Sequence, residues 1–191
     1  MDTRELITAY ETELIDAVRK IDPAQVGKAL DILMEAYRAD KQVFVFGNGG
    51  SAATANHFVC DFGKNAVQGD RRRFRIISVS DNVEKITALG NDIAYEQVFR
   101  QQLINLMRAG DVAIAISASG NSPNVVRACE YVKELGNRLI VLAGFSGGQI
   151  APMGDAAMVA DMTSYERVED IHLILLHMVV CYFKEHQELF A

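Results

Sequence analysis

The 191-residue sequence has little cysteine: Cys60, Cys129 and Cys181 stand singly in apolar stretches. It contains no CxxC pair, so the usual sequence patterns of cysteine zinc sites and redox dithiols are excluded. Isolated cysteines in apolar surroundings behave as small hydrophobic residues. We therefore expect all three side chains to be buried.

Long apolar runs and an excess of basic residues are also missing. No segment is apolar for long enough to cross a bilayer, and the formal net charge of -6 argues against broad attraction to nucleic acid. The first 20 residues are charged and periodic, unlike a secretory signal. We therefore expect a cytoplasmic protein without a membrane or nucleic-acid partner.

The sequence does contain five short apolar runs in which polar residues do not alternate. Half of all residues are apolar, enough for the core of one domain spanning residues 1–191. Runs rich in branched residues predict strands that are buried on both faces. The predicted strands are 42–47, 74–80, 111–117, 138–144 and 156–161.

Helical segments alternate with these strands. The predicted helices are 51–63, 82–90 with 95–109, 123–136 and 165–189, preceded by 3–20 and a helix that starts at Asp22-Pro23 and ends near 40. The alternation predicts a doubly wound α/β fold with a mainly parallel five-stranded sheet and helices on both faces. Residues 1–40 would form a helical appendage that packs on this domain or on a partner subunit.

Two loops at predicted strand ends have the composition of a phosphate site. The first is Gly47-Asn48-Gly49-Gly50-Ser51, and the second is the serine-rich segment 117–122. Ligands of parallel α/β sheets bind beyond the carboxyl ends of strands, where helix N-termini offer free N–H groups. Each loop alone also fits a simple turn with an N-cap. Two of them at neighbouring strand ends favour phosphate binding.

A nucleotide site is the alternative for the first loop. Residues 47–52 match G-x-G-x-x-G/A, but that fingerprint requires an acid about 20 residues later to bind the ribose. The nearest candidate, Asp81, lies more than thirty residues beyond Gly49, and no G-x-x-x-x-G-K-[ST] motif is present. A singly phosphorylated small molecule fits better.

Histidines and acids on two predicted helices could bind a metal or transfer protons. His57 and Asp61 are four residues apart and share a helix face. The last helix contains His177, for which Asp170, seven residues earlier, is the acid closest to the same face; Glu169 is offset by about 80°. No HExxH motif is present, and a buried core histidine is the alternative for His177. The same predicted helix also contains the acid Glu166 and the histidine His172.

Four stretches of the chain carry a resemblance to a known family. These are "GNGGSAATANHF" (47–58), "GND" (90–92), "GDVAIAISASGNSPNV" (110–125) and "RVEDIHLILLH" (167–177). In order and spacing they resemble the sugar isomerase (SIS) domain family, and within it the isomerases of sedoheptulose 7-phosphate. The resemblance implies a homotetramer with active sites between subunits.

The resemblance also implies roles for single residues. It places one Zn²⁺ or another divalent ion per subunit on His57, Asp61, Glu169 and His177, and so selects Glu169 over Asp170. Asp61 and His177 would transfer protons. The substrate-binding set would be Asn48, Gly49, Ser51, Asp92, Ser117, Ser119, Ser122 and Glu169.

Four positions depart from the pattern of the similar isomerases. Asp61 stands in place of Glu, Glu169 in place of Gln, Ala118 in place of Thr and Glu166 in place of Asp. The Glu-to-Asp change moves a carboxylate by one methylene, and the Gln-to-Glu change adds a negative charge. Two histidines with two carboxylates still suit zinc, but these changes bear on which sugar is the substrate.

The resulting functional prediction is an aldose–ketose isomerase of a phosphorylated sugar, such as sedoheptulose 7-phosphate. The alternative is a non-catalytic SIS protein that binds a replication-initiator protein or senses a sugar phosphate. Such relatives lack the acid and the final histidine, so Asp61 and His177 favour an enzyme. The arginine-rich segment 70–75 would contact an acidic partner or a phosphate, or lie in a solvated loop.

Overall fold

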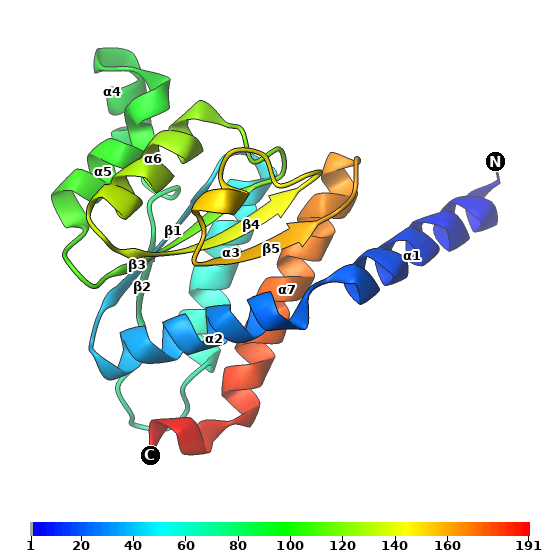
Figure 1. Ribbon diagram of the computed structural model, residues 1–191, viewed down its shortest axis with the longest axis horizontal. Coiled ribbons are helices and arrows are strands. Elements are labelled where there is room, and N and C mark those ends of the chain that lie inside the picture. The colour runs from blue at the N-terminus through cyan, green and yellow to red at the C-terminus, as the bar shows by residue number, and fades with distance from the viewer. Residues whose placement is uncertain (1) are drawn as a thin grey trace.

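The computed structural model describes residues 2–191 and contains a five-stranded parallel sheet in the order β2-β1-β3-β4-β5 (Figure 1). From β1 the chain adds β2 on one side of the sheet and then β3, β4 and β5 on the other side. The sheet is therefore doubly wound, with the change of direction between β1 and β3. The predicted α/β class is confirmed. The strands are β1 (Gln42–Gly47), β2 (Arg75–Ser78), β3 (Val112–Ser117), β4 (Arg138–Gly144) and β5 (Ala156–Ala160).

The helices follow the predicted order with small differences at their ends. The last long helix ends at Glu185 rather than at 189, because His186 leaves helical geometry and the chain continues as a short 3-10 turn. The α-helices are α1 (Thr3–Lys20), α2 (Pro23–Arg38), α3 (Gly50–Asn65), α4 (Val83–Asp92), α5 (Val98–Leu106), α6 (Pro123–Glu134) and α7 (Tyr165–Glu185); the 3-10 turns are η1 (Tyr95–Gln97), η2 (Ala151–Met153) and η3 (Gln187–Phe190). Within residues 2–191, no helix is both long and apolar enough to span a membrane.

The sheet separates two apolar cores. Val43 and Val45 of β1 face a core formed with α2, α3 and α7, whereas Phe44 and Phe46 face a core formed with α5 and α6. Successive side chains of a strand point to opposite faces, so a strand that is covered on both faces must be apolar at every position. This burial explains the continuous apolar runs in the sequence.

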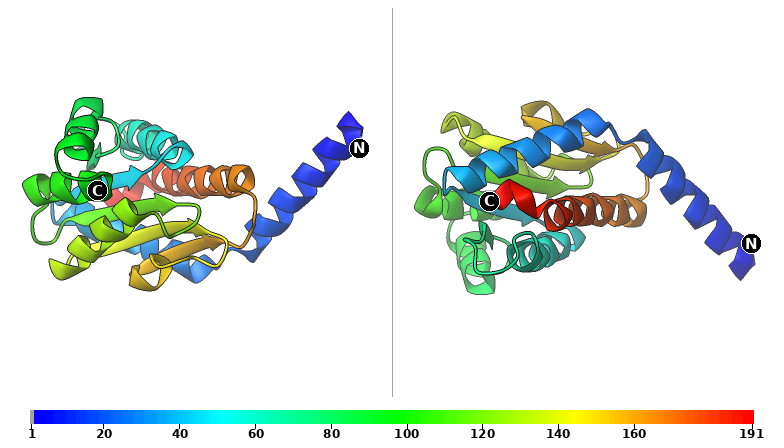
Figure 2. Two further views of the ribbon diagram at one scale, coloured as in Figure 1. Left: turned by 90° about the horizontal axis from the view of Figure 1, so that it is seen from above. Right: turned by 90° about the horizontal axis from the view of Figure 1, so that it is seen from below.

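The two N-terminal helices differ in their surroundings. Asp22 caps α2 through the backbone N–H of Ala24, with Pro23 at the first helical position as predicted, and α2 packs against β1, β3 and β5 of its own sheet. Helix α1 instead extends away from the body (Figures 1 and 2). Leu6 and Ile7 on α1 are 46% and 61% exposed. Only α1 therefore has the character of an appendage.

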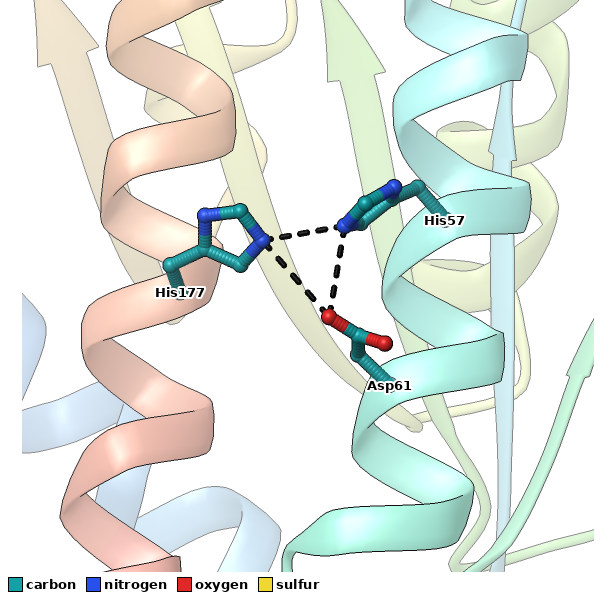
Figure 3. A group of neighbouring side chains, drawn as sticks. All are labelled: His57, Asp61 and His177. Carbon is teal, nitrogen blue, oxygen red and sulfur yellow. Dashed lines mark hydrogen bonds and ion pairs between the residues drawn. The ribbon is translucent and has the colours of Figure 1, made fainter.

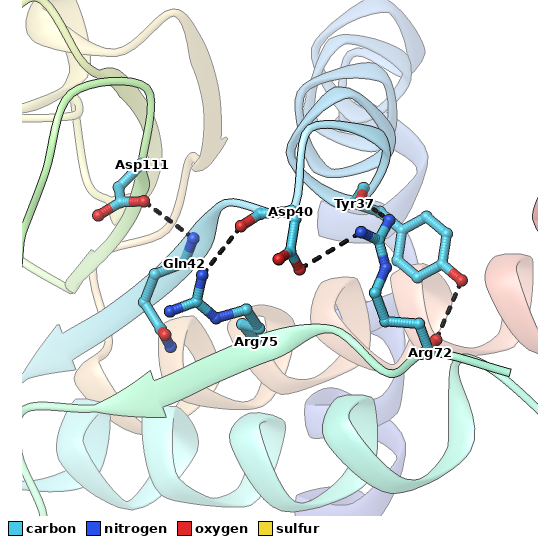
Figure 4. Close-up of polar contacts among 6 residues, drawn as sticks. All are labelled: Tyr37, Asp40, Gln42, Arg72, Arg75 and Asp111. Carbon is cyan, nitrogen blue, oxygen red and sulfur yellow. Dashed lines mark hydrogen bonds and ion pairs between the residues drawn. The ribbon is translucent and has the colours of Figure 1, made fainter.

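The arginine-rich segment binds the ends of neighbouring elements (Figure 4). Arg72 donates to the carbonyl of Tyr37 at the end of α2, forms an ion pair with Asp40 at 3.4 Å and covers the Tyr37 ring. Arg75 donates to the carbonyl of Asp40, and Arg71 donates to Gln187 after α7. Cations at helix C-termini satisfy free carbonyl groups. These arginines therefore join α2 and the C-terminal segment to the sheet edge.

The prediction that all three cysteines are buried is correct for one of them. Cys129 lies on the buried face of α6, and burial raises the pKa of its thiol to about 12. Cys60 on α3 and Cys181 on α7 are exposed. The prediction was wrong for these two because both helices are amphipathic, and an apolar neighbourhood in the sequence does not specify which face a residue occupies.

Candidate active site

Both predicted phosphate loops lie at the same edge of the sheet and form one cavity. Because β1 and β3 are neighbouring parallel strands, the loops that follow them emerge side by side. A cavity of about 160 Å³ lies between these loops and the start of α7. We call it the serine pocket; its lining residues are Asn48, Ser51, Ile116, Ser117, Ala118, Ser119, Ser122, Tyr165 and Glu169.

Two glycines of the first loop have distinct roles. Gly49 is the N-cap of α3 and has a φ of +53°, a conformation that residues with a Cβ rarely adopt. A Cβ at Gly50 would lie 2.1 Å from Oε2 of Glu169. Glycine at this position therefore allows the Glu169 carboxyl group to approach the N-terminus of α3.

Helices α3 and α6 both begin at the serine pocket. Among residues 2–191, neither N-cap residue forms a side-chain capping hydrogen bond, so free backbone N–H groups remain at both helix starts. On α6 this free group is the N–H of Asn124, because that of Val125 already donates to Asn124 Oδ1. Ser122 occupies the N-cap position of α6, but its side chain makes no capping hydrogen bond, and its hydroxyl lies 3.4 Å from the Ser117 hydroxyl. Uncapped helix starts together with serine hydroxyls form a binding site for an anion such as phosphate.

Glu169 gives the serine pocket an acidic wall. Burial is the main cause that raises the pKa of its carboxyl group, and the negative charges of Glu166 and Asp170 add to the effect. A protonated carboxyl group has one donor and one acceptor oxygen, as a Gln amide has a donor and an acceptor. The environment thus shifts Glu169 towards its protonated form relative to an exposed glutamate.

A second group of polar side chains lies further along α3 and α7 (Figure 3). His57 Nε2 is 2.9 Å from His177 Nε2 and 3.3 Å from Asp61 Oδ2, and His177 Nε2 is 3.7 Å from the same oxygen. The three side chains are 46%, 45% and 31% exposed, respectively. We call this group the imidazole cluster.

The imidazole cluster fits a zinc ion. Ligand atoms about 2.0–2.1 Å from a tetrahedral zinc lie about 3.3 Å from one another, and the three observed separations of 2.9, 3.3 and 3.7 Å are close to that value. Two imidazole nitrogens and one carboxylate oxygen are a donor set of catalytic zinc sites, in which a fourth position stays open. His57, Asp61 and His177 would hold the ion.

Glu169 and Asp170, the two acids considered as a fourth zinc ligand, both lie outside the imidazole cluster. Glu169 is eight residues before His177, or about 12 Å along the helix axis, and it lines the serine pocket. Asp170, which helix geometry favoured, accepts a 2.5 Å hydrogen bond from the hydroxyl of Tyr10 on α1. Of the four predicted ligands, the chain therefore brings three together.

Two predicted substrate residues, Gly49 and Asp92, are not among those that line the serine pocket. Gly49 is next to it as the N-cap of α3, whereas Asp92 is further away in the chain. Asp92 is exposed at the end of α4, where it accepts a hydrogen bond from Asn91. Tyr165, which lines the pocket, and Asn124, which is hydrogen-bonded to Asn48, were not among the predicted site residues. Asn124 stands directly after the Ser-Pro of the second loop, and this position was the sequence feature that could have indicated its place in the site.

Comparisons with known proteins show the family of the chain. A model of the SIS domain matches residues 8–144. The phosphoheptose isomerase of Geobacter sp. (strain M21) is 34% identical over 175 residues, which are 92% of this chain and 86% of that protein. The phosphoheptose isomerase of Pelobacter propionicus is 40% identical over 147 residues, 77% of each chain.

A solved structure supports the same relationship. Phosphoheptose isomerase from Neisseria gonorrhoeae superposes with a TM-score of 0.86 at 29% identity, covering 96% of this chain and all of that one. The similarity therefore extends over nearly the whole chain. The sequence matches and the shared architecture show that this chain belongs to the SIS domain family.

Proposed function

We propose that this protein is a phosphosugar aldose–ketose isomerase of the phosphoheptose isomerase type, with sedoheptulose 7-phosphate or a closely related ketose phosphate as substrate. One observation carries the proposal: an anion pocket and a cluster of proton-carrying side chains share α3 and α7. His57 is six residues beyond Ser51, or about 9 Å along α3. That separation is comparable with the length of an extended sugar phosphate.

The isomerisation moves one proton between neighbouring carbons and one between their oxygens. A base removes the proton alpha to the carbonyl and an enediolate forms. The hydroxyl proton is transferred to the former carbonyl oxygen, and an acid returns a proton to the former carbonyl carbon. We assign these transfers to Asp61 and His177, whose carboxylate and imidazole groups can accept and donate protons. The serine pocket would bind the phosphate and fix the sugar relative to these groups.

We assign one Zn²⁺ to His57, Asp61 and His177 in each subunit. When bound there, zinc would polarise the substrate carbonyl and stabilise the developing negative charge. Glu169 of the same chain would remain in the serine pocket as a substrate-binding residue. It could join the ion only from a second copy of the chain.

Two features support a homotetramer with active sites between subunits. The serine pocket is smaller than the roughly 300–1,000 Å³ of most small-molecule sites, so a second chain would complete its walls. An apolar groove of about 370 Å³ runs between α2 and α7, lined by residues including Ile21, Val26, Ile174 and Met178. Exposed apolar residues of the protruding α1, such as Ile7, would pack into this groove of another chain.

Substitution of Ile7 tests the assembly. We expect the wild-type protein to elute as a particle of four times 21.1 kDa in light-scattering chromatography. Ile7→Asp, at a position 61% exposed in one chain, should give smaller particles and lower activity, because a charge would be buried in the interface. Leu135→Asp at the end of α6 is the matched control. A tetramer that persists in Ile7→Asp would contradict the role of α1.

A substrate panel tests the function. Purified protein with equimolar Zn²⁺ is incubated with ketose phosphates of five to eight carbons, and NMR follows formation of the aldose phosphate. We expect turnover of the seven-carbon substrate, together with about one zinc per chain in the isolated protein. Absence of turnover across the panel, with no zinc retained, would favour a non-catalytic SIS protein instead.

A further inference from the structure

Asn48 is held by hydrogen bonds that connect the two loops of the serine pocket. Its Nδ2 donates to Asn124 Oδ1 over 2.8 Å, and Asn124 Nδ2 donates back to Asn48 Oδ1 over 2.9 Å. The hydroxyl of Tyr95, in η1, donates to the same Asn48 oxygen over 3.1 Å. Asn124 is 2% exposed at the start of α6, whereas Asn48 lines the pocket.

A backbone group determines the orientation of both amides. The N–H of Val125 donates to Asn124 Oδ1 over 3.0 Å. A backbone N–H can only donate, so the amide atom that faces it must be an oxygen. The Asn48 atom opposite that oxygen must then be Nδ2, which leaves Asn48 Oδ1 facing Asn124 Nδ2. Tyr95 consequently acts as a donor towards Asn48.

This arrangement leaves Asn48 with one kind of free hydrogen-bonding group. An amide oxygen has two acceptor lone pairs, and here both are used, by Asn124 and Tyr95. The amide nitrogen has two N–H groups, and one is used by Asn124. Among the described residues nothing accepts from the other N–H, which belongs to a side chain that lines the serine pocket.

We infer that Asn48 contacts the substrate only as a hydrogen-bond donor, and that Asn124 and Tyr95 are positioning residues that impose this role. The inference rests on the proposed function for the identity of the ligand. The acceptor would be an oxygen of the sugar phosphate, and a ligand group that can only donate would be disfavoured there. Because the donor is oriented before the ligand arrives, binding needs no reorientation of the amide.

Kinetic double-mutant cycles test this coupling. We expect Asn48→Ala to raise KM for the ketose phosphate about tenfold and Tyr95→Phe to raise it about threefold, the range of one lost or weakened hydrogen bond. In the Asn48→Ala background, Tyr95→Phe should have no further effect. Tyr95 is 58% exposed, so its substitution leaves the core intact. Tyr131→Phe, on α6 and outside this network, is the matched control.

Two isosteric variants test the direction of the hydrogen bonds. Asn48→Asp keeps the acceptor for Tyr95 and Asn124 but removes both N–H groups, so it should weaken binding at least as much as Asn48→Ala. Asn124→Asp keeps the acceptor for Val125 but no longer donates to Asn48, and it should raise KM with little change in kcat. A Tyr95→Phe effect that persists unchanged in the Asn48→Ala protein would overturn the inference.

A measurement on the ligand-free protein separates this inference from the proposed function. In ¹H–¹⁵N spectra, Tyr95→Phe should shift the side-chain amide signals of Asn48, while Tyr131→Phe should not. If these shifts occur but no ketose phosphate is turned over, the network stands and the proposed function fails. If turnover is normal and the Asn48 amide signals do not respond to Tyr95→Phe, the network is wrong.

Discussion

His177→Ala is expected to lower kcat for sugar-phosphate isomerisation by about a thousandfold, within the range of a lost general acid–base group. The substitution removes one of three side chains whose ligand atoms meet between α3 and α7. It should also abolish stoichiometric zinc binding, because two remaining ligands rarely retain the ion. NMR of the ketose-to-aldose conversion and metal analysis of the purified protein measure the two effects.

The fold should survive this change. The His177 side chain is 45% exposed, and α7 is anchored by buried neighbours such as Ile171, Leu175 and Val179. His186→Ala, at the end of the same helix and outside the imidazole cluster, is the matched control. Circular dichroism should show the same helix content in both variants. Unaltered turnover in His177→Ala would refute the assignment of the active site.

The second large expected effect is a loss of about 3 kcal/mol in the free energy of unfolding as pH falls from 6.5 to 4, caused by His172. The ring is 0% exposed, and neither nitrogen has a partner in hydrogen-bonding geometry among residues 2–191. Burial lowers its pKa to about 4, and the nearby carbonyl of Ala143 opposes this only in part. The unfolded chain would bind a proton below about pH 6.5.

The direction of this pH effect on the free energy of unfolding follows from which state carries the proton on His172. Between pH 6.5 and 4 the unfolded chain carries the His172 proton and the folded chain does not, so lower pH stabilises the unfolded state. Above pH 6.5 neither state is protonated at this ring and the contribution is constant. Carboxylates such as Asp155, whose pKa is lowered in the fold, add their own loss only at lower pH.

Urea unfolding between pH 4 and pH 7.5 measures this effect. His172→Leu removes the titrating ring and should flatten the pH dependence by about 3 kcal/mol over the window. His186→Leu exchanges the same residue types outside the core and should leave the wild-type slope. An equally steep slope in His172→Leu and wild type would show that another group is responsible.

Local signals in the sequence were reliable for the elements and loops. The five apolar runs predicted the strands to within three residues at each end, because a strand covered on both faces is apolar throughout. The Asp22-Pro23 pair located the start of α2 for a similarly local reason. The segment 70–75 was ambiguous, since the carbonyl groups that its arginines bind belong to distant elements.

Such local patterns could not predict contacts between residues far apart in the sequence. Asp170 was favoured because the periodicity of one helix shows which residues share a face, but that periodicity cannot show that Tyr10 of α1 binds this acid. For the same reason, Cys60 on α3 and Cys181 on α7 were predicted to face the core, although both are exposed. Each outcome depends on which element packs beside the helix.

The sequence by itself determined the alternation of strands and helices, the two loops beyond β1 and β3, and the chemistry of the residues they contain. The family resemblance implied that His57, His177 and Glu169 share a site. Only the tertiary structure decided that His177 meets His57 across 120 residues while Glu169 enters the serine pocket, and that Asn48 pairs with Asn124. The physical reason is that patterns along the chain report local conformation and burial. The site arises where the parallel sheet brings separate helix N-termini and two helix faces together.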